Sequence, residues 1–175
     1  RPRPGRAFGV AVGVQSVIGF SAIPSQRRTT VFHFIKIGAD GAQLADDATD
    51  HVAVIDTRTN LMWSANDATD KRVKFADASP ACAALSLAGF TDWRMPTVEE
   101  LFLLADRSKF NPAIDTDAFP TATSDWYWSG TVDAGSPSGC AWCVNFDHRG
   151  CLLGDQYFQG RVRAVRSVSP SASSQ

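Results

Sequence analysis

The sequence predicts an α+β domain with two helices and several short antiparallel strands. Two observations carry this prediction. The two strongest helical signals follow one another between residues 77 and 107. Short apolar segments of strand type lie on both sides of them, and those after Pro112 have no helical period. Two helices followed by short strands favour α+β over a parallel α/β sheet.

Composition and charge limit what this chain does. It has 175 residues, 44% hydrophobic and 20% charged, which fits one folded domain with a short appendage. No stretch of eighteen apolar residues occurs, so no transmembrane helix or membrane insertion is predicted. Residues 1–30 hold five arginines and no acid, so the remaining 12 basic residues face 18 acidic ones, a balance of −6. That balance argues against nucleic acid as a partner.

We expect the main domain to span residues 31–168. Residues 1–30 are apolar over Ala7–Ile23, as in a secretory signal, but three glycines and two polar residues interrupt this stretch. Valines at positions 10, 12 and 14 have a period of two, so an N-terminal extension or strand is predicted instead. Residues 169–175 are small and polar, which is typical of a flexible tail.

The first strands of the domain follow from alternation and turn residues. Val31–Ile37 alternates apolar and polar residues, and the turn Ala39–Gly41 closes it. Val52–Asp56 and Asn60–Trp63 flank a turn at Thr57–Thr59, which predicts a hairpin.

The first helix is predicted to begin at about Asp77 or Ser79 and to end at Ala88. Pro80 fits its first turn, and Gly89 stands where a C-terminal cap is expected.

The second helix has the clearest local signal. Thr97 and Glu100 have the spacing of a capping box, in which each side chain accepts a hydrogen bond from a backbone N–H of the first turn. This helix is expected to end near Arg107. Short strands are then predicted over Tyr127–Ser129, Ala141–Phe146, Leu152–Leu153 and Val162–Val168.

Five motifs in order carry a family resemblance. They are the cysteine-containing segment from Cys82, the string D-W-R-M-P-T-V-E-E-L that ends at Leu101, Trp126–Ser129, Ala141–Phe146 and Arg161–Arg166. With the entry strands around Lys36–Gly41 and Asp56–Trp63, the chain resembles the Lcl C-terminal domain family over Val31–Val168.

The resemblance implies a C-type-lectin-like fold of the formylglycine-generating-enzyme type. Variable proteins of diversity-generating retroelements share this fold, in which strands and two helices display a C-terminal surface for ligand contact. The lectin calcium motifs E-P-N and W-N-D are absent, and no acidic cluster has the spacing of calcium ligands. We therefore expect neither a metal nor a cofactor.

The framework of the domain is expected to consist of buried aromatic residues and of structural ion pairs. Trp93, Trp126, Trp128 and Trp142 are predicted to pack in the core. Alternation in the strand Ala141–Phe146 places Trp142, Val144 and Phe146 inward, and Cys143 and Asn145 outward. Arg94 and Arg166 are expected to form structural ion pairs with Asp92, Glu99 or Asp106.

The four cysteines leave several interpretations open. Cys82 is expected to be a small buried apolar residue. Cys140, Cys143, His148 and Cys151 have the pattern C-x2-C-x4-H-x2-C, which resembles a zinc knuckle apart from its last gap. A disulfide from Cys140 or Cys143 to Cys151 is a second interpretation, and membership of a variable surface is a third.

The variable-surface interpretation rests on the resemblance and on composition. Adenine-directed diversification of Asn-type codons does not generate Glu, Lys, Met, Trp or Gln. Between Gly130 and Gly160 there is no Glu, Lys or Met, while Trp142, Gln156 and Gln159 would be fixed positions. The outward mixture there includes exposed apolar and aromatic residues, which is unusual for a passive surface. The predicted ligand-binding residues are Asp133, Gly135, Ser138, Cys140, Cys143, Asp147, His148, Cys151, Leu153, Asp155, Tyr157, Phe158 and Gly160.

The function expected from these observations is that of a ligand-binding display module and not of an enzyme. Its partner would be a protein or a cell-surface target, and it would act outside the cell, on the cell surface or on a phage particle. The alternative is a metal-dependent or redox enzyme of the formylglycine-generating type that uses Cys140, Cys143 and Cys151. No G-x-S-x-G, H-E-x-x-H or P-loop motif supports another catalytic class.

Overall fold

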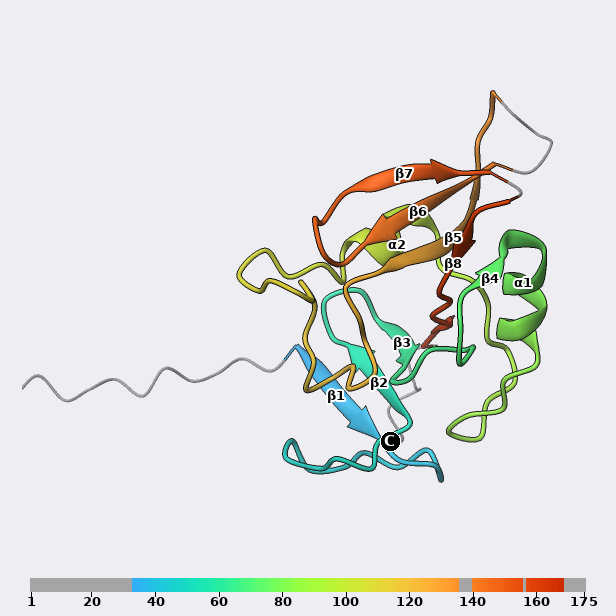
Figure 1. Ribbon diagram of the computed structural model, residues 1–175. Coiled ribbons are helices and arrows are strands. Elements are labelled where there is room, and N and C mark those ends of the chain that lie inside the picture. Colours follow the sequence, from blue (N-terminus) through green and yellow to red (C-terminus); the bar gives the residue numbers. More distant parts are fainter. Residues whose placement is uncertain (1–32, 136–139, 156, 169–175) are drawn as a thin grey trace, which may run out of the picture. The chain divides into compact units, whose positions relative to one another are not determined.

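The computed structural model describes residues 33–135, 140–155 and 157–168 (Figure 1). The predicted N-terminal extension and C-terminal tail lie outside these residues, and so do the first two residues of the predicted strand Val31–Ile37. In chain order the elements are β1 (Phe34–Ile37), β2 (Ala53–Asp56), β3 (Leu61–Ser64), β4 (Val73–Lys74), α1 (Phe75–Ala83), α2 (Val98–Phe102), β5 (Trp126–Val132), β6 (Ala141–Asn145), β7 (Cys151–Gly154), β8 (Gln159–Gly160) and β9 (Val165–Ser167).

The strands pair antiparallel in three small sheets. One sheet has the order β1-β2-β3-β9, a second has the order β5-β6-β7, and β4 pairs with β8. The predicted hairpin is the β2–β3 pair, in which Asp56 lies opposite Leu61. The C-terminal strand β9 returns to pair with β3. The prediction of a mixed α+β domain with two helices and short antiparallel strands is therefore confirmed.

Helix α1 begins and ends earlier than the sequence predicts. Its N-cap is Lys74, an extended residue of β4, so the helix starts directly from the strand that β8 holds in place. Pro80 therefore lies inside the helix and not in its first turn. Gly89 caps no helix. With Ala88, it forms the tight turn of a bridge between Leu87 and Phe90, where both turn residues have positive φ.

Helix α2 has the predicted capping box but is shorter than predicted. The Thr97 hydroxyl accepts from the Glu100 N–H, and the Glu100 carboxylate accepts from the Thr97 N–H at 2.8 Å. The helix ends at Phe102 and not near Arg107. Asp106 accepts hydrogen bonds from the backbone N–H and the hydroxyl of Ser108, and this local turn replaces further helix.

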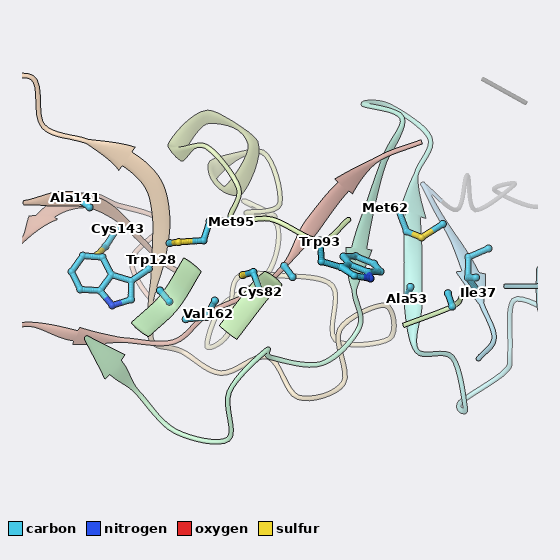
Figure 2. Packing of buried hydrophobic residues seen from close by; sticks show 13 residues of the cluster. Ile37, Ala53, Met62, Cys82, Trp93, Met95, Trp128, Ala141, Cys143 and Val162 are labelled. Carbon is cyan, nitrogen blue, oxygen red and sulfur yellow. The ribbon is translucent and has the colours of Figure 1, made fainter. Parts of the chain in front are cut away.

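The core consists of two clusters that meet at β5 and β6. One cluster runs from Trp128 and Cys143 at one end, past Cys82, to Trp93 and Ile37 at the other (Figure 2). The other surrounds Tyr127 and includes Val144 and residues of α2. Trp128 and Tyr127 are adjacent in β5 and both are 0% exposed. Both faces of this part of the sheet are therefore covered.

This double burial contradicts one expectation from the sequence. Cys143 and Asn145 were predicted to face outward, but both are buried. Cys143 lies opposite Trp128 in the β5–β6 register. The face of β6 that carries Cys143 therefore packs against the first core cluster and does not meet water. Trp142, predicted to be core, is only half-buried.

Ion pairs join the helical region to the C-terminal strands. Arg166 donates to Asp92 at 2.7 and 3.2 Å, which confirms one of the predicted pairings. Arg94 pairs with Glu100 at 2.8 Å through both of its terminal nitrogens and with none of the three acids expected for it. Glu100 is held near Arg94 by its role in the capping box, so this acid and not Asp92, Glu99 or Asp106 meets the guanidinium.

A buried arginine ties the loop after β3 to the segment before β9. Arg163 is 0% exposed, and its guanidinium donates to the carbonyls of Ser64 and Ala65 and to the carboxylate of Asp67 at 2.6 Å. Burial raises the pKa of Asp67, against the effect of Arg163 and Arg161. Removing one partner of such a pair leaves a buried charge uncompensated, which makes this contact a rigid part of the scaffold.

Candidate ligand-binding surface

The candidate surface is carried by the sheet β5-β6-β7 and the loops at its two ends. Ala141 pairs with Gly154 at one end, so Cys140 lies near Asp155, the residue that follows β7. At the other end the Asn145 N–H donates to the Gly150 carbonyl at 2.9 Å. These two ends are separated by four residues of strand, about 13 Å. Among the described predicted binding residues, Cys143, Cys151 and Leu153 lie within β6 and β7, and the others lie outside these two strands.

At the first end, a turn presents an aromatic side chain to solvent. The Asp155 carboxylate accepts from the backbone N–H groups of Tyr157 and Phe158 at 2.9 and 3.0 Å. This Asx-type turn leaves the Tyr157 side chain highly exposed, at 75%. Gly135 is exposed and Asp133 half-buried. Ser138 lies outside the described residues.

At the second end, a buried amide organises the β6–β7 turn. The Asn145 side-chain oxygen accepts from the N–H groups of Asp147 and His148 at 2.6 and 2.7 Å. His148 is exposed and its Nε2 lies 2.9 Å from the Asp147 carboxylate. Sequence reasoning missed Asn145 as the residue that shapes this turn, although an Asn two residues before an Asp-His pair is typical of an Asx turn.

Strand β7 lies between these ends and has one exposed face. Cys151 and Leu153 are exposed, as predicted, whereas Leu152 is half-buried and Gly154 buried. Beside Cys151, a groove of about 220 Å³ is lined by Val98, Glu99 and Phe102 of α2. The sequence did not predict this groove, because it depends on where α2 packs against the sheet.

Three of the predicted binding residues belong to the buried framework. Cys143 is fully buried, and burial raises its pKa to about 12. Phe158 is half-buried, with its ring edge-to-face on Trp128 at a centroid distance of 5.4 Å. Gly160 is buried, and a side chain there would meet the Trp128 ring at 3.1 Å. The common cause is the packing of Trp128, which sequence parity does not reveal.

The cysteines do not come together in the described residues. Cys151 lies opposite Val144 and Cys143 opposite Leu152, so these two thiols are on different faces of the sheet and both are free. Val144, the residue opposite Cys151, follows Cys140 by four residues. Cys140 and Cys151 are therefore about 13 Å apart along the sheet, which is too far for a disulfide. Cys82 is buried as predicted, with a pKa raised to about 12 by burial.

No group of three or more His, Cys, Asp or Glu side chains that could hold a metal ion occurs within residues 33–135, 140–155 and 157–168. In the same ranges no helix is long and apolar enough to cross a bilayer.

These features define a class of protein, namely a small α+β domain in which a sheet covered on both faces at β5 and β6 carries an exposed face on β7 and exposed side chains at its two ends, such as Tyr157 and His148. The profile of the Lcl C-terminal domain family matches residues 52–166. The chain therefore belongs to the Lcl C-terminal domain family, as the motifs of the sequence predict. A comparison with curated proteins gives no match.

Proposed function

We propose that this chain is a ligand-binding display module with a C-type-lectin-like fold of the formylglycine-generating-enzyme type. The observation that carries the proposal is the contrast between the two faces of β7. Leu152 and Gly154 turn toward the Trp128 core, while Cys151 and Leu153 meet solvent. A rigid support under exposed side chains lets them bind with little loss of conformational entropy.

The ligand is a protein or a cell-surface target. Tyr157 and Leu153 are exposed large side chains close to the same end of the sheet, and an exposed tyrosine offers a large contact area at low entropy cost. The acidic balance of the chain beyond residue 30 disfavours nucleic acid. A display role of this kind places the domain outside the cell, on the cell surface or on a phage particle.

The surface is diversified by a retroelement, and the locus provides the test. A template repeat next to a reverse-transcriptase gene is expected to differ from the coding repeat at adenine positions. These differences are expected in codons of exposed residues such as Gly135, His148, Cys151, Leu153 and Tyr157, and not in those of buried Cys143 and Gly160. A locus with neither element would contradict diversification, and ligand binding would then be tested separately.

Ligand binding is tested on intact cells. The labelled domain is expected to bind cells of its target strain within a panel of bacteria, and Tyr157→Ala is expected to lower that binding at least about tenfold, as for an aromatic hot spot. Phe110→Ala is the matched control for the Tyr157 end, because Phe110 is equally exposed, at 73% against 75%, but lies in the loop that contacts the β6–β7 turn, where Arg149 donates to the Arg107 carbonyl. Equal binding of both variants would contradict a role for the Tyr157 end of this surface.

A further inference from the structure

The groove beside β7 is too small for a drug-sized ligand and large enough for one side chain. Its volume is about 220 Å³, below the roughly 300–1,000 Å³ of ordinary small-molecule pockets. Val98, Phe102 and Cys151 supply apolar walls, and Glu99 supplies the one carboxylate among the lining residues. Helix α2 packs against β5 and β6, so the groove opens beyond it, next to the outer strand β7.

Glu99 has no partner for its charge in the described part of the chain. It is exposed, and its carboxylate makes no hydrogen bond or ion pair there, in contrast to its neighbour Glu100, which binds Arg94 through two bonds. Burial raises the pKa of the Cys151 thiol, and the negative charge of Glu99 raises it further. Arg107 packs over the Phe102 ring at 5.9 Å but neither lines the groove nor pairs with Glu99.

The backbone of β7 has a free edge beside this groove. β7 is the last strand of its sheet, and no other described segment pairs with it. In an antiparallel sheet, successive residues point their N–H and C=O groups alternately toward one neighbouring strand and toward the other. The Asn145 N–H bonds to Gly150 on the β7 side and the Phe146 N–H bonds to Asp125 on the β5 side. Counting on from Gly150, Cys151 and Leu153 direct their N–H and C=O groups away from β6. An extended segment can add to this edge as a fourth strand.

We propose that β7 and the groove bind an extended segment of a partner protein that inserts a lysine or arginine side chain between α2 and Cys151. This inference rests on the proposed function in taking the ligand to be a protein. A residue added directly opposite Cys151 places its side chain on the face where the groove opens. The methylene stem of a lysine or arginine then packs on Val98 and Phe102, and its cation pairs with Glu99.

Charge complementarity selects this occupant over an apolar one. An apolar side chain would cover Val98 and Phe102 but would leave the Glu99 carboxylate beside a newly dehydrated contact without compensation, which is unfavourable. An acidic side chain would add like-charge repulsion. The net charge of −6 beyond residue 30 also favours the approach of a basic segment.

Synthetic peptides test the inference. The probes are seven-residue peptides of alternating valine and threonine with a central lysine, and matched peptides with central norleucine or glutamate. Titration at low ionic strength is expected to give the lysine peptide about tenfold higher affinity than the glutamate peptide, with norleucine between them. Absence of lysine-peptide binding at about 1 mM, or equal affinity for the lysine and glutamate peptides, overturns the inference.

Two variants locate the contact. Glu99→Gln is expected to reduce the lysine preference to within about twofold, and Asp77→Asn, an exposed carboxylate in the first turn of α1, is expected to keep it. Cys151→Lys supplies a tethered cation to the groove and is expected to lower peptide affinity at least about tenfold. Retention of the preference by Glu99→Gln, or of full affinity by a folded Cys151→Lys, overturns the inference.

The same variants separate this inference from the proposed function. If Tyr157→Ala abolishes binding to cells while the lysine preference of the peptides is absent, the groove inference fails and the display function stands. If the lysine preference is present and depends on Glu99 while Tyr157→Ala binds cells as wild type does, the groove is supported and the proposed role of the Tyr157 surface fails.

Discussion

β6 and β7 are neighbouring strands of one sheet, each with a cysteine, but only β7 presents its cysteine to water. Cys143 on β6 is 0% exposed and lies opposite Trp128, whereas Cys151 on β7 is exposed beside the α2 groove. Both strands are mostly apolar in sequence, with A-W-C-V-N in β6 and C-L-L-G in β7. Their difference teaches that alternation predicts which residues share a face, but the neighbours of that face decide whether it is a core or a surface.

The largest expected change in stability follows from removing the Trp128 ring, which packs under β6 and β7. Trp128→Ala removes a side chain that is fully buried against Cys143, Phe75 and Phe158, and should lower the free energy of unfolding by about 3–5 kcal/mol. Trp142→Ala is the control, because the Trp142 side chain on β6 is only half-buried, and it should cost less. Urea denaturation measures both, and an equal cost would mean that the half-buried Trp142 ring contributes as much to stability as the fully buried Trp128 ring.

Local chemistry explains why part of this fold could be predicted from the sequence. The Thr97–Glu100 capping box and the turn between β2 and β3 depend on residues that are three or four positions apart. The length of α1 could not be predicted in the same way, because its start is fixed by β4, which β8 holds from more than eighty residues away.

In the candidate surface, too, the features that depend on local sequence could be predicted, and those that depend on distant contacts could not. The exposure of Cys151, Leu153 and Tyr157 agrees with the sequence prediction, since nothing distant covers them. The burial of Cys143 and Phe158 depends on Trp128, a contact across strands that alternation alone does not contain. The groove at Glu99 depends in addition on the packing of α2.

The second expected effect is on thiol reactivity. Cys151 should react with iodoacetamide on the order of a hundredfold faster than Cys143, because Cys143 reacts only after local opening. Burial and the Glu99 charge raise the pKa of Cys151 above its ordinary value of 9.0, so its thiolate fraction is small at neutral pH. Its rate should therefore rise about tenfold per unit from pH 7 to 9.

Mass mapping of the labelled peptides measures both thiols in one sample. Comparable rates at Cys143 and Cys151 would show that β6 opens as readily as β7. A rate for Cys151 that levels off below pH 8 would contradict the raised pKa.

The third effect compares two adjacent residues of β7. Gly154→Ala places a Cβ 2.6 Å from the Trp128 ring and 2.9 Å from Phe158, so it should destabilise the domain by about 1–3 kcal/mol through overpacking. Leu153→Ala, on the exposed face, should stay within about 0.5 kcal/mol. Thermal denaturation of the two variants checks this, and a harmless Gly154→Ala would mean that the strand is free to move away from the core.

The last comparison, with an effect no larger than that of Gly154→Ala, is between two consecutive aromatic residues after β7. Phe158→Ala should cost about 1–3 kcal/mol, less than a fully buried ring, because Phe158 is half-buried edge-to-face on Trp128 and Trp126. Tyr157→Ala should change stability by no more than about 0.5 kcal/mol, because that side chain is 75% exposed. The Asp155 turn fixes both backbone positions, so neither substitution removes the hydrogen bonds that hold them. Urea denaturation that gave the two variants equal stability would mean that Phe158 is as free as Tyr157, and the boundary between scaffold and surface would then lie one residue further toward the core.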